Sequence, residues 1–452
     1  MYNYNMLTIN VGKTALTTTA QNDRGTSLLS DYDVNKILKH KLGGDSNFRL
    51  VDWRLDLFGE GKGFLGQYYH LCVTAQVDGD DTKSPQFFVK TPPPQTPQFD
   101  FLQRHDTFNK EIVGYTDLAR RMGVGESPAW MVNCYCCKRD VVIVLEDASL
   151  GGCATLDKYI PFDVEHCVLT LKTLSRLHSK SLILDERLRL EGRAIPDLYG
   201  HLLDEVLFSK DEISMRFLSS DITGIYTLFD LRGDSHNPPL IEGFSDNEKA
   251  VVKRRIAEWS WKLPRLLGPS KKYRNVICHR DVWTNNIMFR YDPSGKLNGC
   301  RLIDFQFYTY CPPAIDFTFC LYLTADQATR DLHFDAFARI YHDSFAQLLA
   351  EDSFDAEDYL PWTTFRDSCM EVRNVAIVYA AHCLQIMLLS SNTTVEYFVN
   401  DTSDRLMDVM YGDGRRELVL CQCEKEPSYK ARLLEVIHEI KDRLPDRPPM
   451  NI

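Results

Sequence analysis

The sequence I-C-H-R-D-V-W-T-N-N-I-M-F-R at residues 277–290 decides the fold class. It places His279, Asp281 and Asn286 in the array H-x-D-x-x-x-x-N, and Asp304 follows in the run R-L-I-D-F-Q. Phosphoryl transfer from ATP needs a carboxylate that positions and deprotonates the attacking hydroxyl, together with oxygen ligands for Mg²⁺. The sequence therefore predicts Asp281 as the catalytic base and Asn286 and Asp304 as metal ligands.

The separation between Asn286 and Asp304 has a structural reason. Residues 287–291 and 297–303 are strand-like, and the segment D-P-S-G-K between them contains the Pro and Gly typical of turns. A hairpin of this kind returns the chain, so both metal ligands are expected at the same end of it. A single aspartate would be more typical of a cap or turn, and only the joint pattern indicates a kinase-type site.

Length and composition are those of an ordinary globular protein. With 452 residues, 44% of them hydrophobic and 25% charged, the chain can hold two or three average domains or one large two-lobed one. The formal net charge of -11 argues against nucleic acid or anionic lipid as a partner. Because no signal-like segment opens the chain and no run approaches a membrane span, we expect a cytoplasmic protein with reduced cysteines.

A glycine motif is expected in the N-terminal lobe, after a flexible tail at residues 1–30. Alternating apolar and polar residues predict strands at 51–57 and 69–77. Between these strands lies a G-x-G-x-x-G motif formed by Gly61, Gly63 and Gly66. A dinucleotide-binding fold would need a helix after this motif. We therefore interpret it as a lid over ATP phosphates, with an ordinary glycine-rich hairpin turn as the alternative.

Lys90 and Glu111 are candidates for the ion pair that directs a lysine onto the α- and β-phosphates. Lys90 ends a short strand expected at 87–90, after which prolines 92, 93, 94 and 97 argue against regular structure. Helical spacing of apolar residues covers 101–122 and includes Glu111.

The crossing between lobes is expected at Glu146-Asp147, after a buried strand at 141–145. In a two-lobed kinase, backbone groups at this point meet the adenine, so Glu146 is assigned to nucleotide binding. Just upstream stand Cys134, Cys136 and Cys137. Zinc would need paired C-x-x-C spacing with further ligands, so reduced thiols at a strand end are favoured over a zinc site.

The remainder of the chain is predicted to be mainly helical. Asp163 can cap a helix that carries His178, which we interpret as a structural hydrogen-bonding histidine. Ser245 and Glu248 fit a capping box. Further helices are expected near 326–350, 366–391 and 428–444. We expect an N-terminal lobe at 31–147, a second lobe at 148–425, and a C-terminal helix and tail at 426–452.

Together these motifs resemble the ecdysteroid kinase-like family, in the choline-kinase and aminoglycoside-phosphotransferase branch of the protein-kinase-like fold. The motifs occur in this order: the glycine motif, Lys90, Glu111, Glu146-Asp147, the array from His279 to Asn286, I-D-F-Q at 303–306, and Asp316. The resemblance covers about residues 35–420. The combination of H-x-D-x-W-x-x-N with I-D-F-Q is specific, whereas the glycine motif is not.

The resemblance implies an α+β, two-lobed fold that uses ATP and Mg²⁺ to phosphorylate a hydroxyl of a small molecule. The N-terminal lobe would contain a mainly antiparallel sheet and one main helix, and the larger C-terminal lobe would be helical. By motif position, Asp281 would be the base, Asn286 and Asp304 the magnesium ligands, and Lys90 the phosphate contact. His279 and Asp316 would brace the catalytic loop.

Two positions depart from related patterns. Arg280 stands where small-molecule kinases often have glycine, and the resemblance leaves its effect on the charge of the pocket open. Arg280 makes the loop similar to the H-R-D of protein kinases. Gln306, however, replaces the glycine of D-F-G, and the A-P-E element is absent downstream. A small-molecule kinase is therefore favoured over a protein kinase.

The leading hypothesis is a kinase for a lipophilic alcohol such as an ecdysteroid. Choline or ethanolamine phosphorylation is an alternative, because aromatic rings attract quaternary ammonium groups. Six aromatic residues suit either that role or the core: Trp259, Trp261, Tyr308, Tyr310, Phe317 and Phe319. A kinase-like protein that binds a ligand without turnover is a further alternative. The sequence leaves the acceptor and the oligomeric state open.

Overall fold

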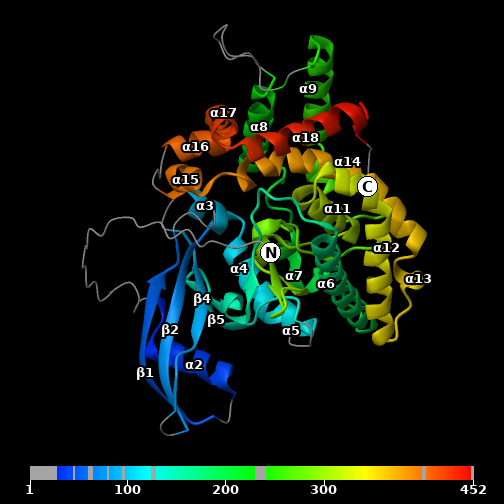
Figure 1. Cartoon of the computed structure of the whole chain (residues 1–452). Coiled ribbons are helices and arrows are strands. Elements are labelled where there is room, and N and C mark those ends of the chain that lie inside the picture. The colour runs from blue at the N-terminus through cyan, green and yellow to red at the C-terminus, as the bar shows by residue number, and fades with distance from the viewer. Residues whose placement is uncertain are drawn as a thin grey trace.

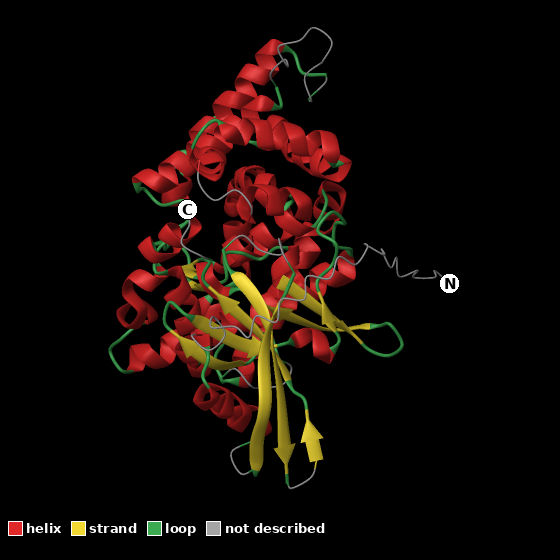
Figure 2. Ribbon diagram, turned by 90° about the vertical axis from the view of Figure 1, so that its left-hand side faces the viewer, coloured by secondary structure: helices red, strands yellow, loops and turns green. Residues whose placement is uncertain are grey.

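The computed structural model describes residues 28–43, 46–59, 65–78, 81–93, 97–123, 129–229, 241, 243–399 and 404–448. Gly61 and Gly63 of the expected phosphate lid, and most of the expected tail, lie outside the described residues. An antiparallel sheet near the N-terminal end joins a larger helical region (Figure 1, Figure 2). This is the α+β, two-lobed architecture expected from the sequence.

The sheet of the N-terminal lobe is antiparallel throughout its described pairings. Its strand order is β1-β2-β4-β6-β5, with β3 paired to β2. The strands are β1 (Phe48–Leu57), β2 (Gln67–Val77), β3 (Asp81–Lys83), β4 (Gln86–Thr91), β5 (Cys134–Lys138) and β6 (Val142–Glu146). In β2 every second residue from Leu71 to Val77 is buried, as expected for a strand with one face in the core. The strands expected at 51–57, 69–77, 87–90 and 141–145 are therefore confirmed.

A helix that the sequence analysis did not anticipate packs on this sheet. Helix α2 (Asp31–Leu42) begins with a capping box in which Ser30 and Asp33 exchange hydrogen bonds. Its apolar side chains form a buried cluster with residues of β2, β4 and β6. The helix contributes Val34, Ile37 and Leu38 to this cluster, and Leu29 joins them. Helix α2, from the N-terminal part of the chain, thus covers one face of the sheet.

The helix expected at 101–122 is present in several pieces. They are α3 (Pro97–Arg104), α4 (Thr107–Val113), the π-helical turn η1 (Gly114–Leu118) and α5 (Ala119–Arg121). The expectation that Pro97 prevents regular structure is wrong, because proline is tolerated in the first turn, where its missing N–H would have no helical acceptor. Asp106 has a left-handed φ of 49° and separates α3 from α4.

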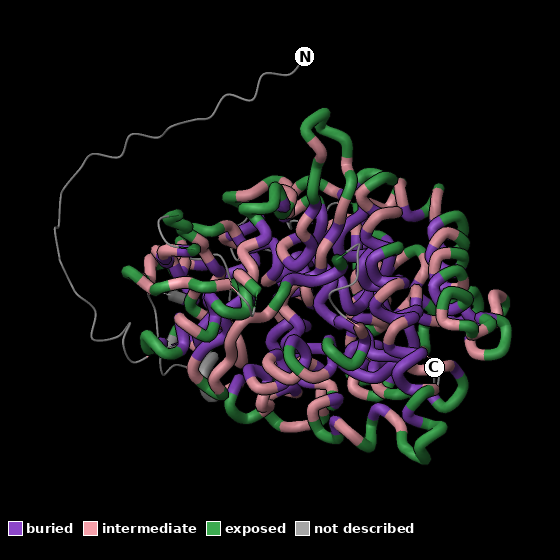
Figure 3. Tube along the Cα trace, turned by 90° about the horizontal axis from the view of Figure 1, so that it is seen from below, coloured by how far each residue is buried: buried purple, intermediate pink, exposed green. Residues whose placement is uncertain are grey.

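The C-terminal lobe is built mainly from helices around one large apolar core, visible as the buried interior in Figure 3. The longer helices are α6 (Val164–Leu190), α8 (Glu212–Thr227), α9 (Asp246–Ser260), α11 (Pro313–Thr324), α12 (Gln327–Glu351), α14 (Trp362–Met387), α17 (Gly414–Lys425) and α18 (Pro427–Arg443). Shorter ones are α7 (Ile195–Tyr199), α10 (Leu263–Leu266), α13 (Ala356–Tyr359), α15 (Ser391–Thr394), the π-helical turn η6 (Val395–Val399) and α16 (Asp404–Tyr411). Asp163 caps α6, and Ser245 with Glu248 forms the capping box of α9. These two caps confirm the sequence-based helix starts.

Two small antiparallel sheets lie among these helices. One has the order β10-β9-β7 and the other pairs β11 with β8. Their strands are β7 (Cys153–Ala154), β8 (Val276–Cys278), β9 (Ile287–Tyr291), β10 (Leu297–Leu302) and β11 (Thr309–Cys311). The predicted hairpin is therefore formed, and the segment between β8 and β9 carries the H-x-D-x-x-x-x-N array.

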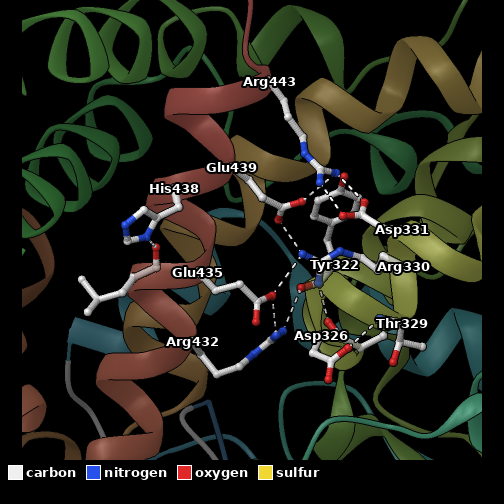
Figure 4. A network of polar contacts seen from close by, with 12 residues as sticks. Tyr322, Asp326, Thr329, Arg330, Asp331, Arg432, Glu435, His438, Glu439 and Arg443 are labelled. Carbon is white, nitrogen blue, oxygen red and sulfur yellow. Dashed lines mark hydrogen bonds and ion pairs between the residues drawn. The ribbon is translucent and has the colours of Figure 1, made fainter. Parts of the chain in front are cut away.

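Helix α18 is fastened to the C-terminal lobe by buried charges (Figure 4). The guanidinium of Arg330, on α12, is fully buried and pairs with Glu435 and Glu439 of α18. Arg443 extends the network to Asp331. A buried charge that loses its partner is strongly destabilising, so this network fixes the position of α18 on α12.

No single described helix combines the length and apolar composition needed to cross a membrane. One pair of helices, Trp362–Met387 with Ser391–Phe398, meets both criteria only when taken together, across a bend of 78°.

Candidate active site

The β9–β10 hairpin brings Asn286 and Asp304 to one place. Ile287 lies opposite Leu302 in the antiparallel register. One residue further out, the Ile303 N–H donates to the carbonyl oxygen of Asn286 at 3.0 Å. Asn286 and Asp304 then line the same cavity, as the hairpin argument predicted.

Asp281 is held beside Asn286. The Nδ2 of Asn286 donates to Oδ2 of Asp281 at 2.7 Å and to its carbonyl oxygen at 3.0 Å. Burial, followed by the neighbouring charge of Asp304, raises the pKa of Asp281 to about 7. A carboxylate with a pKa near neutrality is well matched to accepting a proton from a hydroxyl.

Asp316 fixes the backbone of the segment that carries His279 and Asp281. Its carboxylate accepts the backbone N–H groups of His279 and Arg280, the latter at 2.9 Å. His178 Nε2 lies 3.2 Å from the same carboxylate, and His178 Nδ1 lies 2.6 Å from the Tyr341 hydroxyl. His178 is thus a structural hydrogen-bonding histidine, as predicted. Burial opposes ionisation of Asp316, but the contact with His178 lowers its pKa.

His279 connects the loop to the end of the hairpin. Its Nε2 lies 2.9 Å from the carbonyl oxygen of Ile303, and its Nδ1 accepts the Asp281 N–H at 3.3 Å. Burial lowers the pKa of His279, so the neutral ring with the proton on Nε2 satisfies both contacts. His279 therefore positions Asp281 and the residue before Asp304 together.

Lys90 and Glu111 form the ion pair that the sequence predicted. Lys90 Nζ lies 2.6 Å from Oε2 of Glu111 and 2.9 Å from Oδ1 of Asp304, with both lysine and glutamate buried. Burial alone would lower the pKa of Lys90, but the carboxylates of Asp304 and Glu111 raise it well above its usual value. The lysine is therefore a fixed positive charge that joins β4, α4 and the hairpin.

Two residues around Asp304 were not anticipated. Asp304 has a left-handed φ of 67°, and its N–H donates to the Tyr115 hydroxyl at 3.0 Å. Gln306 Oε1 lies 3.4 Å from Lys90 Nζ. Tyr115 lies one helical turn after Glu111, so the spacing of four residues could have indicated that both face the same site.

Gly66, the described glycine of the motif, lies close to Lys90. A Cβ at this position would come within 3.1 Å of the Thr91 carbonyl oxygen and 3.4 Å of Lys90 Cε. The backbone at Gly66 therefore approaches the Thr91 carbonyl more closely than a larger residue would permit without a small shift, and lies in ordinary contact range of the lysine stem.

Glu146 lies at the end of β6, where the chain leaves the N-terminal sheet. Its carboxylate is 2.6 Å from Arg301 Nη1 on β10, and Asn133 Nδ2 donates to it at 2.8 Å. Burial opposes ionisation, but the contact with Arg301 lowers the pKa of Glu146. The carboxylate thus ties the inter-lobe segment to the hairpin, and the Glu146 N–H donates to the Asn133 carbonyl oxygen at 2.8 Å.

Lys90, Glu111, Asp281, Asn286 and Asp304 all line one cavity of about 660 Å³. Residues near the inter-lobe segment line one part of it: Val132, Leu145, Ala148, Met288 and Ile303. Helices of the C-terminal lobe line another part, mainly through apolar side chains. Of the six aromatic residues proposed for a cation-binding role, none lines this cavity; Trp261 is 43% exposed and the other five are buried in the core.

The side chain of Arg280 does not line the cavity, although its charge acts on Asp281 and opposes the rise in the pKa of that carboxyl. Arg280 has a left-handed φ of 71°, and its guanidinium pairs with Glu205 at 2.7 Å over the rings of Phe319 and Tyr379. The sequence left the effect of Arg280 on the pocket open. In the structure, the left-handed backbone directs this side chain into the core.

The cysteines are all free thiols. On β5, the Sγ atoms of Cys134 and Cys137 lie 3.2 Å apart in a thiol–thiol contact. Burial raises the pKa of the Cys136 thiol.

Comparison with known proteins gives a family assignment. A model of the ecdysteroid kinase-like family matches residues 60–353, and no curated protein sequence matches the chain. Among solved structures, the chain is similar to the GDP and kanamycin complex of APH(2")-IIia at 10% identity and a TM-score of 0.36, over 91% of this chain and 99% of that one. It is also similar to a choline/ethanolamine kinase family protein from Mesorhizobium loti at 11% identity and a TM-score of 0.31, over 85% of this chain and 92% of that one. Because the family model spans more than half of the sequence, the protein belongs to the ecdysteroid kinase-like family.

Proposed function

We propose that the protein is an ATP-dependent phosphotransferase that phosphorylates a hydroxyl of a small, largely apolar alcohol, such as an ecdysteroid. The observation that carries this proposal is the convergence on one cavity of Lys90 with its ion pair, the Asp281–Asn286 pair and Asp304. Each supplies a group that phosphoryl transfer requires. The apolar lining of the C-terminal part favours a lipophilic acceptor. In this proposal the enzyme is cytoplasmic, as expected from the sequence.

The residues present suit Mg²⁺ and ATP. Asp304 offers a carboxylate with 22% of its side chain exposed. The Nδ2 of Asn286 donates to Asp281, and no hydrogen bond to its amide oxygen occurs among the described residues. Hard oxygen donors of this kind suit Mg²⁺, which would neutralise charge on the phosphates. Lys90 would contact the α- and β-phosphates, Gly66 would lie in the phosphate lid, and the backbone at Glu146 would meet the adenine.

Asp281 would receive the proton of the acceptor hydroxyl. Asn286 holds Oδ2 of Asp281, and no hydrogen bond to Oδ1 occurs among the described residues. Oδ1 can therefore accept the proton of the substrate hydroxyl. At the same time, the oxygen of that hydroxyl forms a bond to the terminal phosphorus of ATP. The bond between that phosphorus and the bridging oxygen breaks, ADP leaves, and the proton stays on Asp281.

A panel of acceptors tests this function. ATP consumption with Mg²⁺ would be measured with ecdysteroids, other lipophilic alcohols, choline and ethanolamine, with Asp281→Asn as the blank. We expect turnover on a lipophilic alcohol that disappears in the blank. Turnover on choline or ethanolamine alone would support the alternative kinase, and Mg-ATP binding without any turnover would support the non-catalytic alternative.

The pH profile tests the role of Asp281. Because the base must be ionised, we expect kcat/KM to rise about tenfold per pH unit below a midpoint near the raised pKa of about 7, and to level off above it. The same shift makes the folded protein bind a proton that the unfolded chain has released, so the contribution of Asp281 to stability falls as the pH rises between 3.8 and about 7. Initial rates from about pH 5 to pH 9 would check the predicted pH dependence of kcat/KM. A flat profile below about pH 7 would show that Asp281 is not the base.

Gly66→Ala tests the close approach of Gly66 to the Thr91 carbonyl beside Lys90. The added Cβ must displace that carbonyl by a few tenths of an ångström. We expect a penalty of about 1 kcal/mol in ATP binding, which is roughly a fivefold rise in KM for ATP. Gly268→Ala is the matched control, because a Cβ there meets nothing within 4 Å. Equal KM values in the two variants would show that Gly66 is no closer to the nucleotide than any surface glycine.

A further inference from the structure

The C-terminal part of the cavity has an apolar wall. It is lined by Phe208, Phe217, Ile386, Leu406 and Met410, which come from α8, α14, α16 and the segment before α8. None of these side chains offers a strong hydrogen-bonding group, so any polar group in this wall is an exception that restricts what can bind there.

Asp221 on α8 and His382 on α14 are such polar residues, as are Ser214 on α8 and Tyr411 on α16. Asp221 and His382 both line the cavity, and both side chains are fully buried. Arg415 pairs with Oδ1 of Asp221, and Ser260 Oγ lies 2.6 Å from Nε2 of His382. The other two polar atoms, Asp221 Oδ2 and His382 Nδ1, have no hydrogen-bond partner in the described part of the chain.

These two atoms lie 3.6 Å apart, beyond the range of a hydrogen bond to each other. A buried polar atom without a partner costs on the order of 1–3 kcal/mol, so such atoms are normally satisfied by a partner, water or a ligand. A single oxygen atom can lie about 2.8 Å from both, because their separation is less than the sum of two such bonds. One oxygen atom could therefore bridge these two enclosed atoms.

The chemistry of the pair selects a hydroxyl. A hydroxyl both donates and accepts, so it can donate to Asp221 Oδ2 when that carboxyl is ionised and accept from a proton on His382 Nδ1. Burial raises the pKa of Asp221 to about 7. Burial lowers the pKa of His382 to about 3, which keeps the ring neutral with one nitrogen as donor and the other as acceptor. The quaternary ammonium of choline has no N–H or O–H and cannot replace this hydroxyl.

We propose that Asp221 and His382 bind a second hydroxyl of the acceptor, so that the substrate class is an extended, mainly apolar diol. One hydroxyl lies at Asp281 and the other at this pair. The inference rests on the proposed function for the first hydroxyl, but the binding of the second does not require turnover. Asp221 and His382 are accordingly specificity-determining residues that position the substrate.

Matched alcohols test the proposal. The probes are androstanediol, with hydroxyls at opposite ends of a rigid ring system, androstanol, with one hydroxyl, and linear terminal diols of increasing length with their mono-ol counterparts. Binding would be measured by calorimetry without ATP, and phosphorylation separately with Mg-ATP. We expect the best diol to bind at least about tenfold more tightly than its mono-ol, since a site built for a hydroxyl is left with unpaired atoms by a ligand that lacks it.

Variants assign the selectivity to the pair. His382→Phe and Asp221→Asn are expected to bring the diol to mono-ol affinity ratio to within about twofold of unity. Asn retains an oxygen for Arg415 but replaces the acceptor that faces the cavity. His342→Phe is the control: His342 is a buried histidine bonded to the Leu360 carbonyl oxygen and does not line the cavity, so the ratio should persist. Thermal unfolding would verify that each variant is folded.

The outcomes separate this proposal from the proposed function. Selective binding of a diol that depends on His382, without phosphorylation of any probe, would support the hydroxyl site and contradict the kinase assignment. Phosphorylation of diols and mono-ols with equal efficiency would support the kinase and overturn the hydroxyl site, as would a ratio unchanged in His382→Phe. Either of these last two results would mean that a buried water, and not a substrate hydroxyl, forms the hydrogen bonds with Asp221 and His382. If no diol bound at all, the proposal would also be overturned.

Discussion

Replacing Asp281 by asparagine is expected to lower kcat by about 10²–10⁴-fold, the contribution of a well-placed general base. The variant keeps the size of the side chain and an oxygen that can accept from Asn286. It removes a carboxylate whose ionisation is opposed by burial and by Asp304, so the stability of the fold near neutral pH should be retained or increased. Steady-state rates with Mg-ATP and thermal unfolding would measure both effects.

Asp292→Asn provides the control for this substitution. Asp292 lies in the turn of the same hairpin, where its carboxylate accepts backbone N–H groups from Ser294 and Lys296. The turn is at the opposite end of the hairpin from Asn286. We expect kcat to be unchanged in this variant. If Asp281→Asn kept more than about a tenth of the wild-type kcat, the carboxylate would not be the base.

Replacing Lys90 by methionine is expected to impair both stability and nucleotide binding. The change leaves the buried carboxylate of Glu111 without its cation, at a cost of about 3–5 kcal/mol. It also removes the positive charge assigned to the phosphates. Urea unfolding and ATP titration would measure the two losses. Lys83→Met, on the exposed strand β3, should change neither.

A double variant separates the two losses. Combining Lys90→Met with Glu111→Gln removes the charge that would otherwise be buried alone, so we expect much of the stability to return. ATP binding should not return, because neither substitution restores a cation at the phosphates. Recovery of ATP binding in the double variant would show that Lys90 acts through the fold alone.

Local sequence was sufficient to predict much of the candidate site. The hairpin between Asn286 and Asp304 follows from two strand-like runs and a Pro-Gly turn, and its antiparallel register brings both residues to one end. The strand that ends at Lys90 and the helix that carries Glu111 follow from apolar periodicity. The pairing of this lysine and glutamate depended on the kinase pattern as well as on periodicity. It is confirmed by the 2.6 Å contact.

Local sequence pattern did not predict helix α2, because residues distant in the sequence provide the surface on which this helix packs. The capping box of α2 was present in the sequence, but the helix is stabilised by burial on a sheet that forms from later residues. Pro97 was read as a breaker, whereas its position in the first turn makes it compatible with a helix. Propensity is a weak prior in such cases, and tertiary packing overrides it.

The sequence by itself determined the chemical class of the site, because the identities and spacing of Asp281, Asn286 and Asp304 are confined to one loop and one hairpin. Only the tertiary structure decided which other side chains reach that site. Arg280 has a left-handed φ, and its side chain pairs with Glu205 instead of lining the cavity. Separate helices bring Asp221 Oδ2 and His382 Nδ1 to 3.6 Å from each other in the cavity wall. Side chains so distant along the chain become neighbours through packing of the core, and no local period records that contact.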